Sequence, residues 1–118
     1  MMKHKRIPQK IRLQVYNKYN GHCAYCGCRL EYKDMQVDHI ESVYAHNGGD
    51  TLANYMPSCR QCNFYKSTFS LEDYRKRLQT VNIRLRKQFL YNLAIKYRMV
   101  TEHNEPIRFY FEKMEENK

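Results

Sequence analysis

The stretch that decides the fold begins with CAYCG at residues 23–27 and ends with CRQCN at residues 59–63, with VDHI at residues 37–40 between them. Each end carries a Cys-x-x-Cys pair, and two such pairs supply the four thiolates of a tetrahedral structural zinc site. The loop of residues 27–58 is longer than a minimal zinc ribbon needs, so it must hold further structure. The predicted zinc ligands are Cys23, Cys26, Cys59 and Cys62.

The composition indicates one compact domain with an anionic partner. A chain of 118 residues is short for two independent cores, so we predict a single domain over residues 1–118. The formal net charge is +9, and residues 1–30 and 74–101 contain no acidic side chain at all. Nucleic acid is a commoner partner than a membrane surface for positive charge spread this widely.

The cysteines are better explained as metal ligands than as disulfides. Residues 1–10 hold no apolar stretch of the signal-peptide kind, and the chain lacks the ~18 uninterrupted apolar residues of a membrane span. We therefore expect a cytoplasmic protein without a membrane partner, in a compartment that disfavours structural disulfides. The fifth cysteine, Cys28, is left outside the ligand set because Cys23 and Cys26 have the required spacing, followed by a glycine.

Hydrophobic spacing and turn residues predict an α+β fold. A helix should begin at Pro8, which lacks the amide hydrogen that a first turn leaves unpaired, and Gly21 is placed to end it. Pro57 should terminate a short strand, because proline cannot donate to a strand ladder. The expected elements are a helix at 8–19, a strand at 35–40, an irregular loop at 42–52, a strand at 54–56, a short helix at 59–67, a long helix or two joined helices over 70–98, and a late strand at 107–112.

Residues inside the predicted cage suit phosphodiester hydrolysis, which needs a base to deprotonate water and a cation to stabilise developing charge. His39 suits the first task near neutral pH, and a hard divalent ion held by oxygen ligands suits the second. Adjacent residues of a regular strand point to opposite faces. We therefore predict that the strand ends or kinks at Asp38 and His39, so that both can reach one phosphate.

Supporting roles are predicted for the residues around these groups. Asn54 should lie opposite the first strand, where it can brace the His39 loop and orient the ring. Asn63 directly follows the last predicted zinc ligand, so the zinc would fix where its amide points. Arg60, Asn63 and Lys66 are spaced by three along one helix face. We predict that Arg60 and Lys66 contact nucleic acid there.

Residues 21–67 resemble the HNH endonuclease family, in its zinc-bearing ββα-metal branch. The resemblance implies a small ββα-metal core in which His39 is the general base, Asp38 and Asn63 bind a catalytic ion, and Asn54 orients the base. Asparagine stands at position 63 where many members carry histidine, which favours Mg²⁺ or Mn²⁺ as that ion. The matching residues are Cys23, Cys26, Gly27, residues 37–40, Gly48, Gly49, Asn54, Cys59, Arg60, Cys62, Asn63 and Lys66.

The predicted function is a metal-dependent DNA endonuclease that acts on double-stranded DNA without a small-molecule cofactor. One alternative is a zinc-stabilised nucleic-acid-binding module, whose salt-sensitive binding would survive His39→Ala. Another is a zinc deaminase, in which His39 and two cysteines would share the zinc; Ser58, however, interrupts the Pro-Cys step of that pattern. Oligomeric state and sequence preference stay open, and His46 is given no role.

Overall fold

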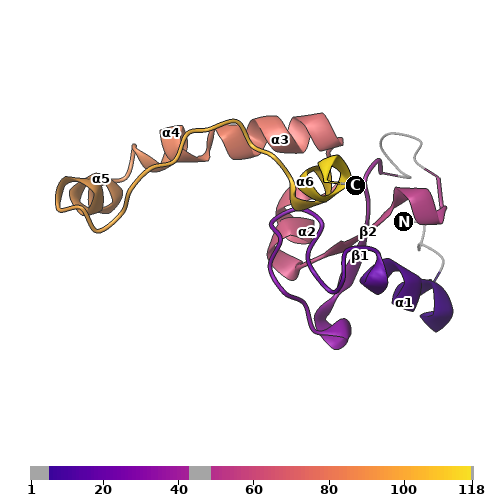
Figure 1. The fold of residues 1–118 in the computed structure, drawn as a ribbon. Coiled ribbons are helices and arrows are strands. Elements are labelled where there is room, and N and C mark those ends of the chain that lie inside the picture. Colours follow the sequence, from indigo (N-terminus) through magenta and orange to yellow (C-terminus); the bar gives the residue numbers. More distant parts are fainter. Residues whose placement is uncertain (1–5, 43–48, 118) are drawn as a thin grey trace. The chain divides into compact units, whose positions relative to one another are not determined.

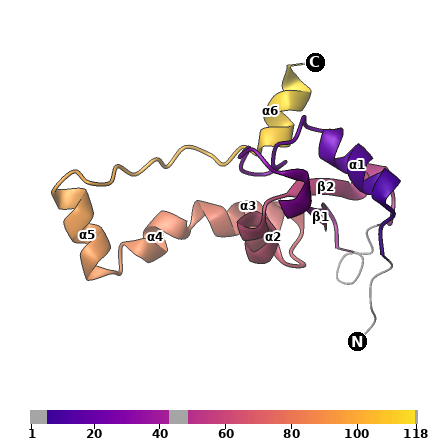
Figure 2. The ribbon, with the colours of Figure 1, turned by 90° about the horizontal axis from the view of Figure 1, so that it is seen from below.

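The computed structural model describes residues 6–42 and 49–117, and two compact units emerge from it. The first comprises the chain up to residue 71 together with residues from 108 onward, and the second comprises residues 72–107 (Figures 1 and 2). That they fold together as one domain stays a prediction. No helix among the described residues combines the length and apolar character needed to cross a bilayer.

The first unit is a ββα arrangement with a helix on each side of it in the sequence. A helix forms close to the predicted N-terminal position, directly after the extended residue Pro8. Two short strands and a short helix follow, as predicted, so the α+β class is confirmed. The elements are α1 (Gln9–Asn17), η1 (Tyr32–Asp34), β1 (Gln36–His39), η2 (Leu52–Asn54), β2 (Tyr55–Ser58), α2 (Arg60–Lys66) and α6 (Tyr110–Glu116).

The sheet consists of β1 and β2 in antiparallel register, with His39 opposite Tyr55 and Gln36 opposite Ser58. Pro57 lies within β2 opposite Val37, so the prediction that it ends the strand is wrong. A two-stranded sheet has an open edge on each strand, and a proline is tolerated where its missing amide hydrogen would face outward. Its carbonyl is used, because Ala24 N donates to Pro57 O at 2.8 Å.

Helix α2 is capped by the residue that directly precedes it. Cys59 is the N-cap, and its Sγ accepts a hydrogen bond from the backbone amide of Cys62. The helix ends at Lys66, because Ser67 adopts a left-handed backbone angle of φ 51. The side chain of Lys66 is buried, so this two-turn helix rests on the sheet at its C-terminal end.

The predicted strand at residues 107–112 is wrong, because α6 begins at Tyr110. The alternation of apolar residues around Phe109 matches a strand period, but Phe109 is instead the extended residue before the helix. The amides of Tyr110 and Phe111, which the first helical turn cannot satisfy itself, donate to the carbonyls of Tyr25 and Ala24. These tertiary contacts with the first cysteine turn outweigh the local pattern.

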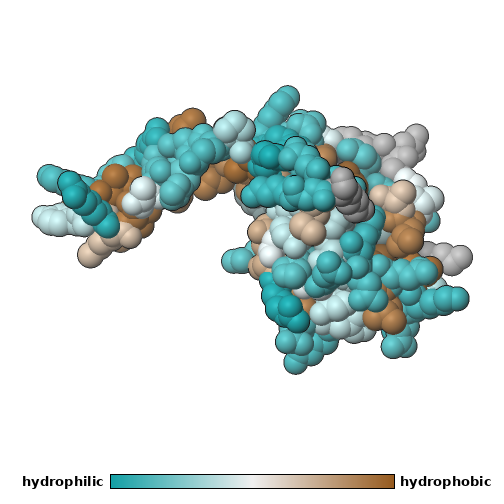
Figure 3. Space-filling model, viewed as in Figure 1, coloured by the Kyte–Doolittle hydropathy of each residue, from teal (hydrophilic) through white to brown (hydrophobic). Residues whose placement is uncertain are grey.

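The second unit contains three short helices where one long helix or two joined helices were expected. They are α3 (Leu71–Gln79), α4 (Val81–Leu85) and α5 (Phe89–Lys96). The first break lies at Thr80, whose hydroxyl donates to Arg77 O and so competes with the helical backbone bonds. Glu102 accepts from both Arg86 and Tyr91, which ties the returning segment to the last two helices. Large apolar side chains stay exposed on this unit, including Phe89 at 77%. The space-filling view shows brown, apolar surface among the hydrophilic residues (Figure 3).

Candidate metal centre and active site

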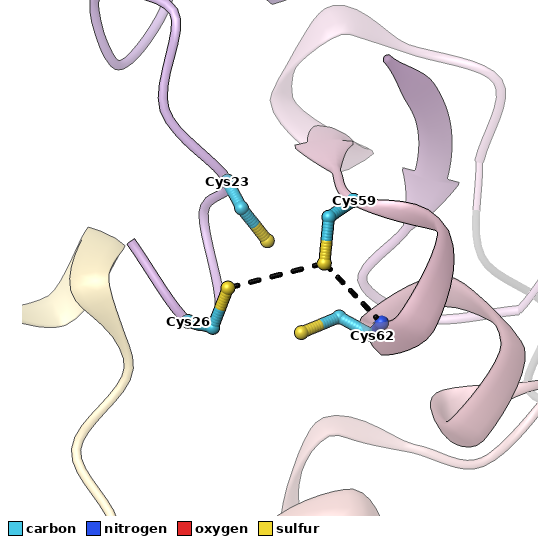
Figure 4. A group of neighbouring side chains, drawn as sticks. All are labelled: Cys23, Cys26, Cys59 and Cys62. Atoms are coloured by element: carbon cyan, nitrogen blue, oxygen red, sulfur yellow. Dashed lines mark hydrogen bonds between the residues drawn. The ribbon is translucent and has the colours of Figure 1, made fainter. Parts of the chain in front are cut away.

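Four thiols converge where the first cysteine turn meets the start of α2 (Figure 4). One sulfur from each residue lies within 4.8 Å of the others, and the Sγ atoms of Cys26 and Cys59 are 3.9 Å apart. Four sulfurs on a tetrahedral zinc at about 2.3 Å would be separated by roughly 3.8 Å. The group therefore fits a tetrahedral ion such as zinc. Its members are Cys23, Cys26, Cys59 and Cys62, the four predicted ligands.

Hydrogen bonds to sulfur favour the thiolate form that binds metal. A hydrogen bond with the Cys62 thiol lowers the pKa of Cys23 to about 4, against the opposing effect of burial. The amide of Cys62 also donates to Cys59 Sγ at 3.4 Å, and the amide of Cys28 donates to Cys26 Sγ at 3.5 Å. A hydrogen bond to sulfur favours the thiolate, but at Cys26 burial is the larger effect and raises the pKa of that thiol despite the bond from Cys28.

The first cysteine turn depends on Gly27. This residue has φ 83, in the left-handed region that favours glycine. A Cβ at Gly27 would stand 2.8 Å from Cδ2 of Tyr110, so α6 closes directly over the turn. Cys28 supports the turn through its backbone, since Cys23 N donates to Cys28 O at 2.8 Å. Its own thiol lies outside the four-sulfur group, as predicted.

Asp38 is a buried carboxylate with two partners on one oxygen. The residue is 6% exposed, and its Oδ2 accepts a 2.5 Å hydrogen bond from the Tyr25 hydroxyl. The ammonium of Lys66 lies 3.1 Å from the same oxygen. Burial raises the pKa of Asp38 above its usual range, although attraction to Lys66, the Tyr25 hydrogen bond and the charge of His39 all oppose that effect.

Lys66 does not lie on the surface where a contact with nucleic acid was expected. Its side chain is 0% exposed, and Nζ donates to the carbonyl oxygen of His39 at 2.8 Å as well as pairing with Asp38. The expected surface position of Lys66 is thereby corrected, because its charge neutralises an internal carboxylate. Arg60, at the start of α2, is exposed, and its predicted contact with nucleic acid stays a prediction.

His39 is the last residue of β1, so the strand ends at the predicted dipeptide. Its Nε2 lies 3.0 Å from Oδ1 of Asp50, and its ring meets the ring of Tyr55 edge-on at 5.2 Å. The Tyr55 hydroxyl donates to the same Asp50 oxygen at 3.1 Å. Sequence reasoning missed Asp50, although it follows the glycine pair of the motif, because no fixed spacing relates a loop carboxylate to its histidine.

Asn54 joins the two chain segments that hold this pair. Its Oδ1 accepts from the amide of Glu41, while Nδ2 donates to the carbonyls of Glu41 and Gly49 at 3.0 and 2.8 Å. Glu41 lies two residues after His39, the last residue of β1, and Gly49 directly precedes Asp50. Asn54 thus fixes the backbone on both sides of the pair. His46 lies outside the described residues.

Asn63 reaches the face of β1 that carries Asp38. Its Nδ2 donates to Gln36 Oε1 at 2.5 Å, and Gln36 and Asp38, two residues apart in the strand, share one face. The contacts of Asn63 with Gln36 and of Lys66 with Asp38 therefore hold α2 against β1. The nitrogen of the Asn63 amide is thus engaged with Gln36, so the oxygen of the same amide points away from Gln36.

The deaminase interpretation is wrong on the geometry of the described residues. It needs His39 and only two cysteines around the zinc, with a position left for water. The four-sulfur group contains no histidine, and His39 Nε2 instead faces Asp50.

Comparison with known proteins agrees with this geometry. The family model described as HNH endonuclease matches residues 23–69. The SPbeta prophage-derived protein YoqL of Bacillus subtilis (strain 168), named as a candidate HNH endonuclease, is 27% identical over 67 residues, which cover 48% of this chain and 27% of YoqL. The Septu protein PtuB of Bacillus thuringiensis is 39% identical over 62 residues, which cover 49% of this chain and 24% of PtuB. The chain therefore spans only about a quarter of the length of these curated relatives.

Two Cas9 proteins are also similar to part of this chain. The CRISPR-associated endonuclease Cas9 of Corynebacterium diphtheriae is 31% identical over 52 residues, which cover 44% of this chain and 5% of that protein. The crystal structure of the Type II-C Cas9 enzyme from Actinomyces naeslundii superimposes with a TM-score of 0.54 and 24% identity, over 64% of this chain and 8% of Cas9. This second likeness shows a shared fold. Residues 23–69, which hold the cysteine group, both strands and α2, therefore match the HNH endonuclease family in sequence and fold.

Proposed function

We propose that the chain is a metal-dependent endonuclease that hydrolyses phosphodiester bonds in double-stranded DNA. The observation that carries the proposal is the pairing of His39 with Asp50 at the end of β1, inside the segment that matches the HNH family. A histidine oriented by a carboxylate is suited to general base catalysis near neutral pH. Asp38, the residue before His39, is buried, and its carboxylate is proposed below as a ligand of the catalytic ion.

The His39 ring is the proposed general base. An ionised carboxylate only accepts hydrogen bonds, so the Nε2 that faces Asp50 carries the ring proton and Nδ1 is the basic nitrogen. In the proposed step, Nδ1 takes a proton from water as the water oxygen bonds to phosphorus and the bond to the 3′ oxygen breaks. Asp50 then stabilises the imidazolium that results. Asn54 keeps the backbone of both partners in place.

Asp38 and Asn63 are the proposed ligands of the catalytic ion. Their oxygens are hard donors that suit Mg²⁺ or Mn²⁺. When bound, such an ion would supply positive charge to the scissile phosphate and to the departing 3′ oxygen. Gln36 orients the Asn63 amide, and Tyr25 and Lys66 hold the Asp38 carboxylate, so both ligands are positioned before substrate arrives.

The cysteine group is proposed to hold a zinc ion that organises the site without taking part in the reaction. Four thiolates complete a tetrahedral shell and leave no position for water or substrate. Cys59 and Cys62 fix the first turn of α2, which carries Asn63, and the turn of Cys23 and Cys26 carries Tyr25.

Nucleic acid is proposed to approach from the exposed side of α2. Arg60 is the predicted phosphate contact that remains at the surface, and the net charge of +9 favours a polyanion. Lys66 is assigned to the interior instead, where it holds Asp38. We propose a cytoplasmic location, where double-stranded DNA would be within reach.

Plasmid cleavage tests the proposal. Zinc-loaded protein is incubated with supercoiled plasmid and Mg²⁺ or Mn²⁺, beside His39→Ala and the matched control His103→Ala, whose side chain is 76% exposed in the second unit. The parent and His103→Ala should cleave, while His39→Ala should be slower by roughly 10²- to 10⁴-fold, as for loss of a general base.

Two outcomes would overturn the proposal. Equal cleavage by the parent and His39→Ala would mean that His39 is not the base. No cleavage by either, with salt-sensitive DNA binding retained by both, would identify a zinc-stabilised binding module in its place.

A further inference from the structure

We propose that Tyr25 is a positioning residue for the catalytic ion. Its hydroxyl, together with the Lys66 ammonium, occupies Oδ2 of Asp38 and so presents the other carboxylate oxygen to a divalent ion. The inference rests on the proposed function, because Asp38 must be an ion ligand. It adds to that function a link between the cysteine turn and the site of hydrolysis.

The contacts of Asp38 carry the first step. In the described part of the chain, its hydrogen-bond and ion-pair partners, Tyr25 and Lys66, both act on Oδ2, at 2.5 and 3.1 Å. Rotation of the carboxylate would break both interactions inside a site that is 6% exposed, where water cannot replace them readily. Asp38 is therefore held in one orientation, with Oδ1 as the oxygen left for a single bond to metal.

The surroundings of Tyr25 carry the second step. Its ring is buried and meets the rings of Phe109 and Phe111 edge-on, at 5.5 and 6.3 Å. The carbonyl of Tyr25 accepts a hydrogen bond from the amide of Tyr110, the first residue of α6. The start of α6 therefore holds both the ring and the backbone of Tyr25. A hydroxyl carried by so constrained a ring has little freedom to follow Asp38 if the carboxylate moves.

The place of Tyr25 in the sequence completes the inference. It lies between Cys23 and Cys26, so the turn that supplies two sulfurs to the candidate zinc site also supplies the hydroxyl. The neighbouring Ala24 amide donates to Pro57 O, which ties the same turn to β2. Zinc binding would thus fix the orientation of a catalytic-ion ligand through one intervening side chain.

Removal of one oxygen atom tests this role. Tyr25→Phe keeps the ring and its contacts with Phe109 and Phe111 but loses the bond to Asp38. Tyr19→Phe is the matched control, because Tyr19 is also buried in the first unit and its hydroxyl donates to the Glu115 carboxylate at 3.1 Å. Both variants lose one hydroxyl-to-carboxylate bond, but only the first concerns Asp38.

Binding of Mn²⁺ to the zinc-loaded full chain is measured without DNA, from the electron paramagnetic resonance signal of the unbound ion. Tyr25→Phe should raise the half-saturating Mn²⁺ concentration by roughly 10- to 100-fold, as loss of a group that orients a metal ligand does. Asp38→Asn should abolish the site, while Tyr19→Phe should bind as the parent does. In plasmid cleavage, Tyr25→Phe should need more metal but approach the parental rate at saturation, and its zinc content should be unchanged.

A second variant keeps the inference testable if Tyr25→Phe fails to fold. Phe109→Leu keeps the Tyr25 hydroxyl but loosens the ring that carries it, so its half-saturating Mn²⁺ concentration should lie between those of the parent and Tyr25→Phe. Mn²⁺ binding by both variants equal to that of the parent would overturn the inference, and so would parental binding that is indifferent to Asp38→Asn. A parent that binds Mn²⁺ through Asp38 but cleaves no DNA would refute the proposed function and leave the Tyr25 comparison decisive.

Discussion

The ammonium nitrogen of Lys66 lies 3.1 Å from Oδ2 of Asp38, and neither side chain has appreciable contact with solvent. The pair joins the last residue of α2 to the middle of β1. The same nitrogen donates to the carbonyl of His39, so the helix holds both residues of the Asp-His dipeptide. Lys66, which was expected to contact nucleic acid, instead holds the residues of the site in place.

Removal of the Lys66 charge should destabilise the protein. Lys66→Met would leave the Asp38 carboxylate buried without its counter-charge, at a cost of about 3–5 kcal/mol in the free energy of unfolding. Urea denaturation followed by circular dichroism measures the loss. Lys33→Met, at an exposed position, should change stability little, and the double variant Lys66→Met/Asp38→Asn should recover part of the loss. Equal stability of the two single variants would contradict this account.

Neutralisation of Asp50 should slow cleavage without unfolding the chain. Asp50→Asn can present either its amide nitrogen or its oxygen to His39 Nε2, so the tautomer with a basic Nδ1 is no longer enforced. The rate of plasmid cleavage at saturating Mg²⁺ should fall by roughly 10- to 100-fold. Asp34→Asn, on the exposed η1 segment, is the control and should cleave at the parental rate. An undiminished rate for Asp50→Asn would remove Asp50 from the mechanism.

Loss of one candidate zinc ligand should unfold the first unit, whereas loss of the fifth cysteine should not. Structural zinc in small domains contributes roughly 10 kcal/mol or more of binding free energy at pH 7, which becomes folding free energy. Cys62→Ser should therefore lack zinc by elemental analysis and lose helical signal in circular dichroism. Cys28→Ser should keep both, because its thiol lies outside the group. Zinc loss from Cys28→Ser would mean that the ligand set is wrong.

The second unit should lose stability in acid through Glu102. A hydrogen bond from Arg86, the largest effect, lowers the pKa of Glu102 from 4.5 to about 2. A depressed carboxyl pKa adds stability that is fully present above the unfolded value and disappears as the pH falls through the folded value. The stability difference between the parent and Glu102→Gln should therefore narrow between about pH 4.5 and 2. Carbon-detected titration of the Glu102 carboxyl checks the shift, and Glu105→Gln, at an exposed site, should show no such narrowing.

The cysteine group, the two strands and α2 could be predicted because short-range rules fix them. The Cys-x-x-Cys spacing specifies a turn with two thiol groups, and Cys59, one of the four candidate zinc ligands, also caps α2. The segment around Phe109 could not be predicted, since its strand-like alternation is outweighed by amides that bond to the Tyr25 turn. The burial of Lys66 and the pairing of Asp50 depend on contacts between residues far apart in the sequence, which periodicity does not encode.

Helix α2 has only seven residues, too few to persist alone in water, yet it is tied at both ends. Cys59 anchors its beginning through sulfur and Lys66 anchors its end through a buried charge. Between these anchors the helix has an outward surface, on which Phe64 is 84% exposed. Substitutions on that outer surface should therefore be tolerated while Asn63 stays where it is.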